Sequence, residues 1–103
     1  MWQLISAMEL EQYLEEGMPM FLVDLRNREA YARGHIQGAV NIPCDELMER
    51  LGELPRGQQL VLYCHRGPNS MIAARQLSRM GYQVMDVYGG ILAYRGKYIV
   101  QSR

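Results

Sequence analysis

The sequence predicts an α/β fold built around a mainly parallel β-sheet, and three observations support this prediction. Short strand signals alternate with amphipathic helix signals along the whole chain, which is the pattern of β–α–β units. The apolar runs at 20–25 and 60–63 are typical of strands that are buried on both faces. The chain has 103 residues, enough for one core and too few for two. We therefore expect a single domain over residues 1–103.

The expected elements follow one another without a repeat or a linker. Strands are expected at 2–5, 20–25, 39–42, 60–63 and 83–87. Helices or helical turns are expected from Ser6 to Gly17, over 28–32, from Asp45 to 54, from the loop at 65–70 to about 80, and over 91–94. The tail from 96 to 103 gives no clear signal.

Two kinds of signal justify the helices. Ser6 followed by Glu9 is a capping box, and Asp45 is a residue type that caps helix N-termini. Apolar residues at helical spacing predict the buried faces, which in the last long helix belong to Ala73, Leu77 and Met80.

Composition narrows the classes of partner and cofactor. Eleven basic residues balance eleven acidic ones, so no basic excess favours nucleic acid or an anionic membrane. The apolar run at 60–64 is far shorter than the roughly 20 residues of a membrane helix, and residues 1–6 do not resemble a secretory signal. The expected location is the cytoplasm. The two cysteines and two histidines form no zinc-binding spacing, so we expect no metal and no cofactor.

Cys64 is the main candidate for chemistry, because it follows the strongest strand signal and precedes a helix. The carboxyl ends of parallel strands are where ligands bind. Backbone N–H groups and a helix N-terminus at such a loop stabilise an anion, including a thiolate. The rest of the loop fits this role, with two basic residues, a glycine for an unusual backbone conformation, a proline suited to the first helical turn and an inward hydroxyl: His65, Arg66, Gly67, Pro68 and Ser70. We therefore expect a reactive thiolate at Cys64, the alternative being a cysteine that is simply the last buried residue of the strand.

Several motifs in order resemble those of the rhodanese family over almost the whole chain. They are Asp24-Leu25-Arg26 at a strand end, the segment 34–43 (GHIQGAVNIP), the loop 64–70 (CHRGPNS), Gly81-Tyr82 and Gly89-Gly90-Ile91. The loop is similar to the family's active-site pattern Cys-x-x-Gly-x-Arg-Ser.

The resemblance implies a three-layer fold, with a five-stranded sheet in the order 1-5-4-2-3 and helices on both faces. It also implies that Cys64 takes a sulfane sulfur from a donor such as thiosulfate and becomes a persulfide. A thiol, cyanide or an acceptor protein then takes the sulfur, in two half-reactions that need no cofactor. The substrate-binding residues would be those of the loop: His65, Arg66, Gly67, Pro68, Asn69 and Ser70.

Asn69 is the main departure from the family pattern, since Arg is common at this position. Arginine binds oxyanions with two charged hydrogen bonds, whereas asparagine offers a neutral donor. We therefore expect His65 or Arg66 to supply the charge that a thiosulfate donor needs.

Four further residues have supporting or alternative roles. Asp24 and Arg26 are expected to form a structural pair at a strand end, with Arg26 able to shape the site. His35, between Gly34 and Gly38, is expected to hydrogen-bond the backbone and fix a turn. Cys44 is either a half-buried packing residue or a resolving thiol for Cys64.

Other functions on the same fold stay open at this stage. A phosphatase or arsenate reductase would need an arginine six residues after Cys64, where this chain has Ser70. A non-catalytic binding or regulatory module is a second alternative, although such modules typically lose the cysteine that this chain keeps. A sulfur carrier for a dedicated partner overlaps with the sulfurtransferase hypothesis.

Overall fold

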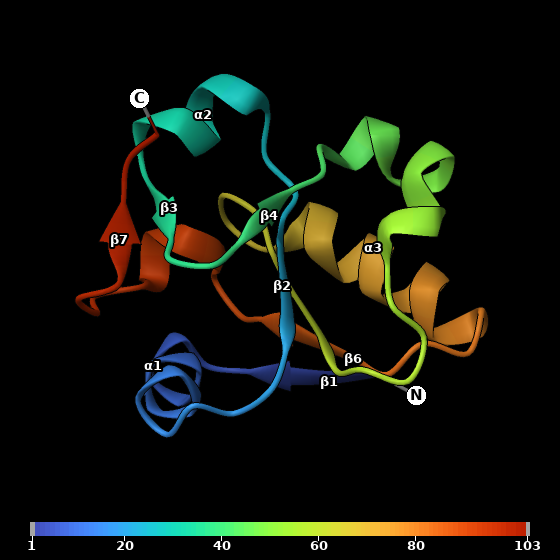
Figure 1. Ribbon diagram of the computed structural model, residues 1–103, viewed down its shortest axis with the longest axis horizontal. Helices are drawn as coiled ribbons and strands as arrows, with labels where there is room; N and C mark the ends of the chain where they lie inside the picture. Colours follow the sequence, from blue (N-terminus) through green and yellow to red (C-terminus); the bar gives the residue numbers. More distant parts are fainter. Residues whose placement is uncertain (1, 103) are drawn as a thin grey trace.

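Five short strands form a parallel sheet in the computed structural model, which describes residues 2–102 (Figure 1). The strands are β1 (Trp2–Ile5), β2 (Phe21–Asp24), β4 (Val40–Asn41), β5 (Leu60–Tyr63) and β6 (Val84–Val87). They lie in the order β1-β6-β5-β2-β4, and each neighbouring pair is parallel. The expected α/β class with a five-stranded parallel sheet is confirmed.

Two strands were not predicted from the sequence. β3 (His35–Ile36) and β7 (Ile99–Val100) pair antiparallel in a separate two-stranded sheet, which accounts for part of the ambiguous tail. Each has only two residues, too few for a hydrophobic period to be visible. The expected order 1-5-4-2-3 left both of them out. It is the order of the main sheet when its five strands alone are numbered along the chain, and it becomes β1-β6-β5-β2-β4 when all seven strands are numbered.

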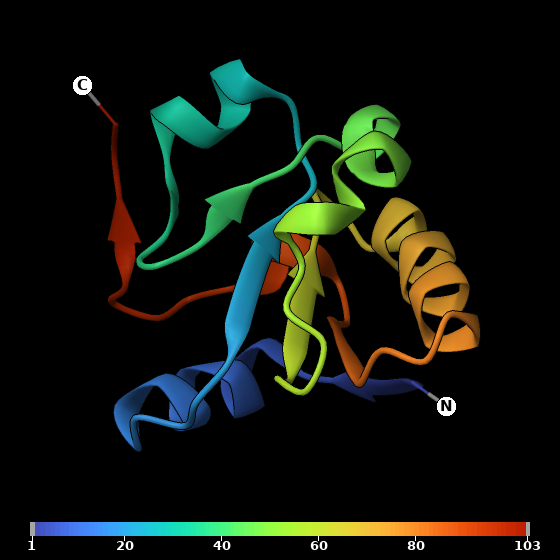
Figure 2. The same cartoon turned by 45° about the vertical axis from the view of Figure 1, so that its right-hand side comes forward.

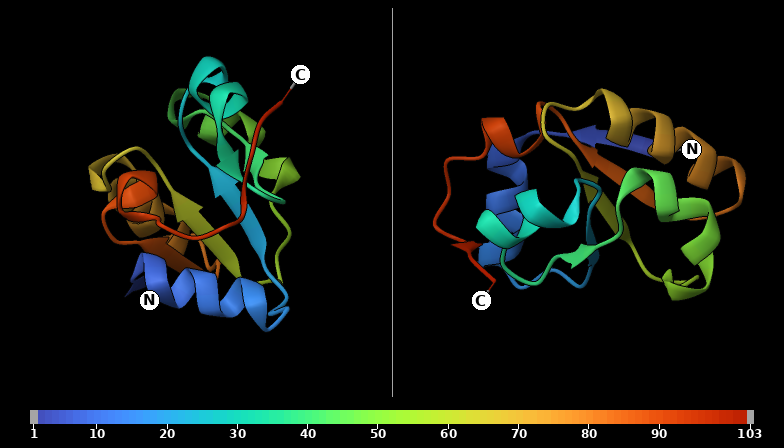
Figure 3. Two further views of the ribbon diagram at one scale, coloured as in Figure 1. Left: turned by 90° about the vertical axis from the view of Figure 1, so that its left-hand side faces the viewer. Right: turned by 90° about the horizontal axis from the view of Figure 1, so that it is seen from above.

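Helical segments cover the two faces of the main sheet (Figures 2 and 3). On one face lie α1 (Ala7–Glu15) and the short 3-10 helix η2 (Gly90–Ala93). On the other lie α3 (Pro68–Arg79) and the 3-10 helix η1 (Cys44–Glu53). The remaining helix, α2 (Arg28–Arg33), connects β2 to β3. None of the helices described in residues 2–102 is long and apolar enough to span a membrane.

The central strand β5 shows why the core has two halves. All four of its residues are buried, and alternate side chains enter opposite layers. Leu60 and Leu62 pack with α3 and η1, whereas Val61 and Tyr63 pack with α1 and η2. Burial of each such side chain stabilises the fold by roughly 1.5–3 kcal/mol. The strand is therefore held firmly up to the residue before Cys64.

The capping box at the start of α1 is confirmed. Ser6 Oγ accepts a hydrogen bond from the Glu9 backbone N–H at 2.9 Å, and Glu9 Oε1 accepts one from the Ser6 N–H at 2.8 Å. These bonds satisfy two N–H groups that have no partner within the helix.

Three details of the expected helices were wrong. Asp45 does not cap its helix, because η1 begins one residue earlier after Pro43 and has no side-chain cap. This segment is a 3-10 helix with a kink at Arg50, and not the continuous α-helix that its leucines suggested. Met80 does not face the core, because it lies at the C-cap of α3, where the helical period no longer fixes its direction.

Candidate active site

Cys64 is the first residue after β5 and lies buried in a four-residue connection to α3. The Gly67 backbone N–H points back at it and donates a hydrogen bond to Cys64 Sγ over 3.0 Å. Gly67 has a φ of 126°, a conformation that residues with a Cβ rarely adopt. The bent loop therefore directs an N–H dipole at the sulfur, which favours negative charge there.

Residues in the first turn of α3 also hold the loop around the Cys64 sulfur. Pro68 is the first residue of the helix, where its missing N–H breaks no hydrogen bond. Ser70 is fully buried, and its hydroxyl donates to the Gly67 carbonyl at 3.0 Å. The Cys64 thiol in turn donates to Ser70 Oγ at 3.4 Å. Ser70 thus ties the loop to the helix whose N-terminus lies below Cys64.

A cavity of about 490 Å³ opens in front of Cys64. Its walls come from the β5–α3 loop, from the segment after β2 and from the start of η1: Leu25, Arg26, Asn27, Ala30, Pro43, Cys44, Asp45, Cys64, His65 and Asn69. His65 and Asn69 are exposed at this cavity, as a substrate-binding role requires. Arg66 lines two smaller hollows beside the loop and does not line this cavity.

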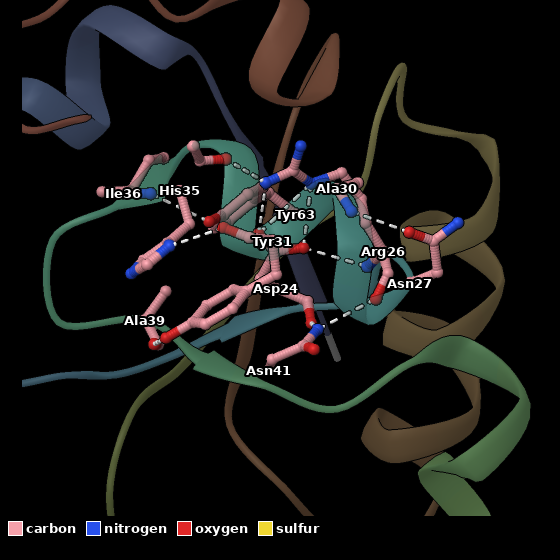
Figure 4. A network of polar contacts seen from close by, with 11 residues as sticks. Asp24, Arg26, Asn27, Ala30, Tyr31, His35, Ile36, Ala39, Asn41 and Tyr63 are labelled. Atoms are coloured by element: carbon pink, nitrogen blue, oxygen red, sulfur yellow. Dashed lines mark hydrogen bonds and ion pairs between the residues drawn. The ribbon is translucent and has the colours of Figure 1, made fainter. Parts of the chain in front are cut away.

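Arg26 also lines this cavity, beside His65 and Asn69. Its guanidinium forms a two-point ion pair with the buried Asp24, with Nε 3.0 Å from Oδ1 and Nη2 2.7 Å from Oδ2. Nη2 also donates to the Gly34 carbonyl at 2.6 Å (Figure 4). Burial acts against the Arg26 charge, but the hydrogen bonds and charge of Asp24 outweigh it and raise the pKa of Arg26. The structural pair is present as expected, and Arg26 also lines the cavity.

His35 occupies the structural position that the sequence suggested. It is buried, its Nδ1 lies 2.7 Å from the Tyr31 carbonyl oxygen, and its ring stacks on Tyr31 at 3.7 Å between centroids. Figure 4 shows His35 and Asp24 in one polar network, with Asn41 donating to the carbonyls of Asp24 and Arg26. The network fixes the segment after β2 as one wall of the cavity.

The first turn of η2 also positions the Cys64 loop, and the sequence did not reveal this. The Ile91 N–H donates to the Cys64 carbonyl at 2.9 Å, and the Leu92 N–H donates to the His65 carbonyl at 3.2 Å. Gly90 packs so closely that a Cβ there would lie 2.5 Å from both carbonyl oxygens. The paired glycines were visible in the sequence, but their contact depends on the β5–β6 adjacency.

Cys44 lies on the wall of the same cavity, at the start of η1. Both cysteines are free thiols, and Cys44 is partly accessible whereas Cys64 is buried. Burial raises the pKa of the Cys44 thiol, and the nearby Cys64 and Asp45 raise it further. Within residues 2–102, no group of three His, Cys, Asp or Glu side chains is placed to hold a metal ion.

These features define a class of protein: a parallel α/β fold that presents a cysteine sulfur to backbone dipoles at a strand end, facing an open cavity. A sequence profile of the rhodanese-like domain matches residues 6–97. The chain therefore belongs to the rhodanese-like domain family.

Individual relatives agree with this assignment. The chain is 37% identical over 81 residues to the thiosulfate sulfurtransferase PspE of Escherichia coli, which covers 73% of this chain and 78% of PspE. It is 32% identical over 94 residues to the putative sulfur carrier protein YrkF of Bacillus subtilis, covering 90% of this chain but only about half (51%) of YrkF. The crystal structure of a rhodanese-like domain protein from Staphylococcus aureus matches with a TM-score of 0.90 at 27% identity, over 98% of this chain and 99% of that chain.

Proposed function

We propose that the protein is a sulfurtransferase that moves a sulfane sulfur through a persulfide on Cys64. The observation that carries the proposal is the Gly67 N–H, which donates to the Cys64 sulfur from a loop at the N-terminus of α3. The name of PspE supports thiosulfate as a donor. We extend the proposal to residues 1–103 as one domain, and to a cytoplasmic location, which two free thiols favour.

The reaction consists of two displacements at sulfur. In the first, the Cys64 thiolate attacks the outer sulfur of thiosulfate, the S–S bond breaks, and sulfite leaves with the bonding electron pair. In the second, cyanide or a thiolate attacks the outer sulfur of the persulfide, and Cys64 leaves as a thiolate. Each step exchanges one bond to sulfur for another, so the two together consume no external oxidant or reductant.

Each nearby residue has a role that its position supports. The Gly67 N–H stabilises negative sulfur in both half-reactions, and Ser70 holds the loop in place. Arg26, whose charge is paired with Asp24, and the hydrogen-bonding ring of His65 line the cavity for an anionic donor, with Asp45 as an opposing carboxylate on the same wall. Arg66 does not line this cavity, but it lines a smaller hollow that also borders Cys64.

The acceptor is a thiol in this proposal, with cyanide as its assay substitute. The name of YrkF supports a further version in which a protein takes the sulfur from Cys64. The cavity suits either acceptor, because it is open towards solvent and ends at Cys64.

Turnover of thiosulfate with cyanide tests the proposal. We expect the purified chain to form thiocyanate with ping-pong kinetics and Cys64→Ser to form none. The thermal unfolding midpoint of Cys64→Ser should stay close to that of the wild type, since oxygen replaces sulfur at one buried site. Thiocyanate formation by a folded Cys64→Ser at the wild-type rate would refute the role of Cys64.

A further inference from the structure

Two cysteine side chains from distant parts of the chain face one cavity. Cys44 and Cys64 both line the space of about 490 Å³ in front of the loop. Cys44 Sγ also lies 3.9 Å from the Asn69 carbonyl oxygen, to which its thiol donates. Cys44 therefore touches the same loop that holds Cys64.

The sheet fixes the separation of the two cysteine backbones. Leu25 lies between them, since its N–H donates to the Tyr63 carbonyl at 2.9 Å and its carbonyl accepts from the Cys44 N–H at 3.0 Å. Tyr63, the last residue of β5, and Cys44, the first residue of η1, are thus about two strand spacings apart, roughly 9–10 Å. A disulfide usually needs Cα atoms within about 7 Å, so direct Cys44–Cys64 bonding would require the backbone to move.

A persulfide on Cys64 changes this geometry. Its outer sulfur lies one S–S bond, about 2 Å, beyond Sγ. Cys64 and Cys44 line the same cavity, and this cavity is the space next to Cys64 that can hold an added sulfur. Cys44 is therefore better placed to reach the outer sulfur, which is the atom to be transferred, than to reach the Cys64 sulfur itself.

We propose that Cys44 is a second sulfur-carrying residue, which takes the outer sulfur from the Cys64 persulfide and presents it at the cavity wall. This proposal rests on the proposed function of Cys64. The Cys44 thiol gives its proton to water, and the thiolate attacks the outer sulfur. The S–S bond to Cys64 breaks, its electron pair stays on Cys64 as a thiolate, and Cys44 becomes the persulfide. One S–S bond replaces another, and no oxidant is consumed.

The local chemistry favours transfer in this direction. The departing Cys64 sulfur is stabilised as an anion by the Gly67 N–H. The raised pKa of Cys44 makes its thiolate the stronger nucleophile once formed, although less of it is present at neutral pH. Cys44 is also partly accessible, so a bulky acceptor reaches its sulfur more easily than the buried Cys64.

The sequence provides a direct readout, because trypsin separates the two cysteines. Cleavage after arginine places Cys44 in the peptide 34–50 and Cys64 in the peptide 57–66. The full chain is mixed with thiosulfate, quenched at intervals with iodoacetamide, digested and analysed by mass spectrometry. If thiosulfate does not load the protein, an inorganic polysulfide serves as the donor. We expect one extra sulfur atom first on 57–66 and then on 34–50, at a rate independent of protein concentration.

Two variants separate this proposal from the proposed function. In Cys64→Ser, 34–50 should gain no sulfur, and in Cys44→Ser, 57–66 should stay loaded several times longer than in the wild type. Loaded Cys44→Ser mixed with unloaded Cys64→Ser tests transfer between chains, and 34–50 should stay unlabelled.

The outcomes that overturn the relay are specific. They are a loaded 57–66 with 34–50 never labelled, labelling of 34–50 in Cys64→Ser or in the mixture, or a disulfide joining the two peptides. A wild-type chain in which 57–66 never gains sulfur would instead refute the proposed function itself.

Discussion

Asn69 is the residue at which the chain departs most clearly from the active-site loop of its family. It is exposed and lines the cavity beside Cys64, so a longer cationic side chain at this position has room to reach an anionic donor. Charged donor groups bind oxyanions more strongly than a neutral amide. In the proposed reaction, Asn69 therefore sets how well the cavity holds an anionic donor, while the loop sets the chemistry.

We expect Asn69→Arg to lower the KM for thiosulfate by about tenfold, the equivalent of roughly 1.4 kcal/mol from one charged hydrogen bond. Initial rates at varied thiosulfate concentration measure the effect. Asn69→Gln adds length without charge and should leave KM nearly unchanged. Equal KM values for the arginine variant and the wild type would contradict a role of charge at position 69 in donor binding.

Ser70 gives a second prediction at the residue scale. Ser70→Ala removes the hydroxyl that donates to the Gly67 carbonyl and accepts from the Cys64 thiol. We expect sulfur loading of Cys64 to slow by about tenfold, the cost of roughly one lost buried hydrogen bond. Stopped-flow measurement of sulfite release follows the step. Ser78→Ala, towards the other end of α3, is the matched control, and equal slowing in both variants would contradict the role of Ser70.

The sequence predicted the local geometry of the residues contiguous with Cys64, and it named Arg26 and Cys44 as possible neighbours without fixing their positions. Strand end, glycine and helix start follow one another at 60–70, so the local geometry could be predicted. Arg26 was expected mainly to pair with Asp24, and the shared cavity of Cys44 and Cys64 could not be derived, because both depend on the order of β5, β2 and β4 across the sheet.

At the scale of elements, the first turn of η2 has the clearest effect on the site. The backbone N–H groups of Ile91 and Leu92 hold two carbonyls of the Cys64 loop, and Gly90 makes the close approach possible. These bonds tie the turn to the loop. The two-residue strands β3 and β7 have no period of their own and were not predicted, whereas η2 lies within one residue of the helical segment expected over 91–94.

We expect Gly90→Ala to lower the free energy of unfolding by about 2–4 kcal/mol, because of its φ of +61° and the clash with two carbonyl oxygens. Sulfur transfer measured well below the melting temperature should fall at least tenfold as the loop shifts. Gly38→Ala is the matched control, since Gly38 also has a positive φ of +89° but no atom within 4 Å of the added Cβ. It should cost roughly 1–2 kcal/mol and keep activity. Similar rates for both variants would contradict the coupling of turn and loop.

At the scale of the whole molecule, a buried carboxyl group links stability to pH. Asp86 lies in β6 with no exposed surface, and neither of its carboxylate oxygens has a hydrogen-bond partner among the described residues. Burial raises the pKa of Asp86 from its ordinary value of 3.8 to about 6. The Ser70 hydroxyl and the Val87 backbone N–H partly offset this effect without reaching hydrogen-bond geometry.

The sign of the effect follows from linkage. Below pH 4 the carboxyl is protonated in both the folded and the unfolded state. As the pH rises towards 6 and beyond, the unfolded state ionises first, so the folded state loses up to roughly 3 kcal/mol of relative stability. We expect Asp86→Asn to remove most of this pH-dependent loss of stability. The free energy of unfolding in urea at pH 5 and at pH 7.5, compared between wild type and variant, measures the effect. If the free energy of unfolding changed equally between the two pH values in the wild type and the variant, ionisation of Asp86 would not be the cause of the pH dependence.

The most direct test of the proposed function is the mass of the peptide 57–66 after the protein has been incubated with thiosulfate or another sulfane-sulfur donor. A persulfide at Cys64 adds the mass of one sulfur atom to this peptide, and cyanide added before digestion removes it. We predict both changes. A peptide whose mass stays the same with each of several donors would contradict the assignment of Cys64 as the sulfur-accepting group.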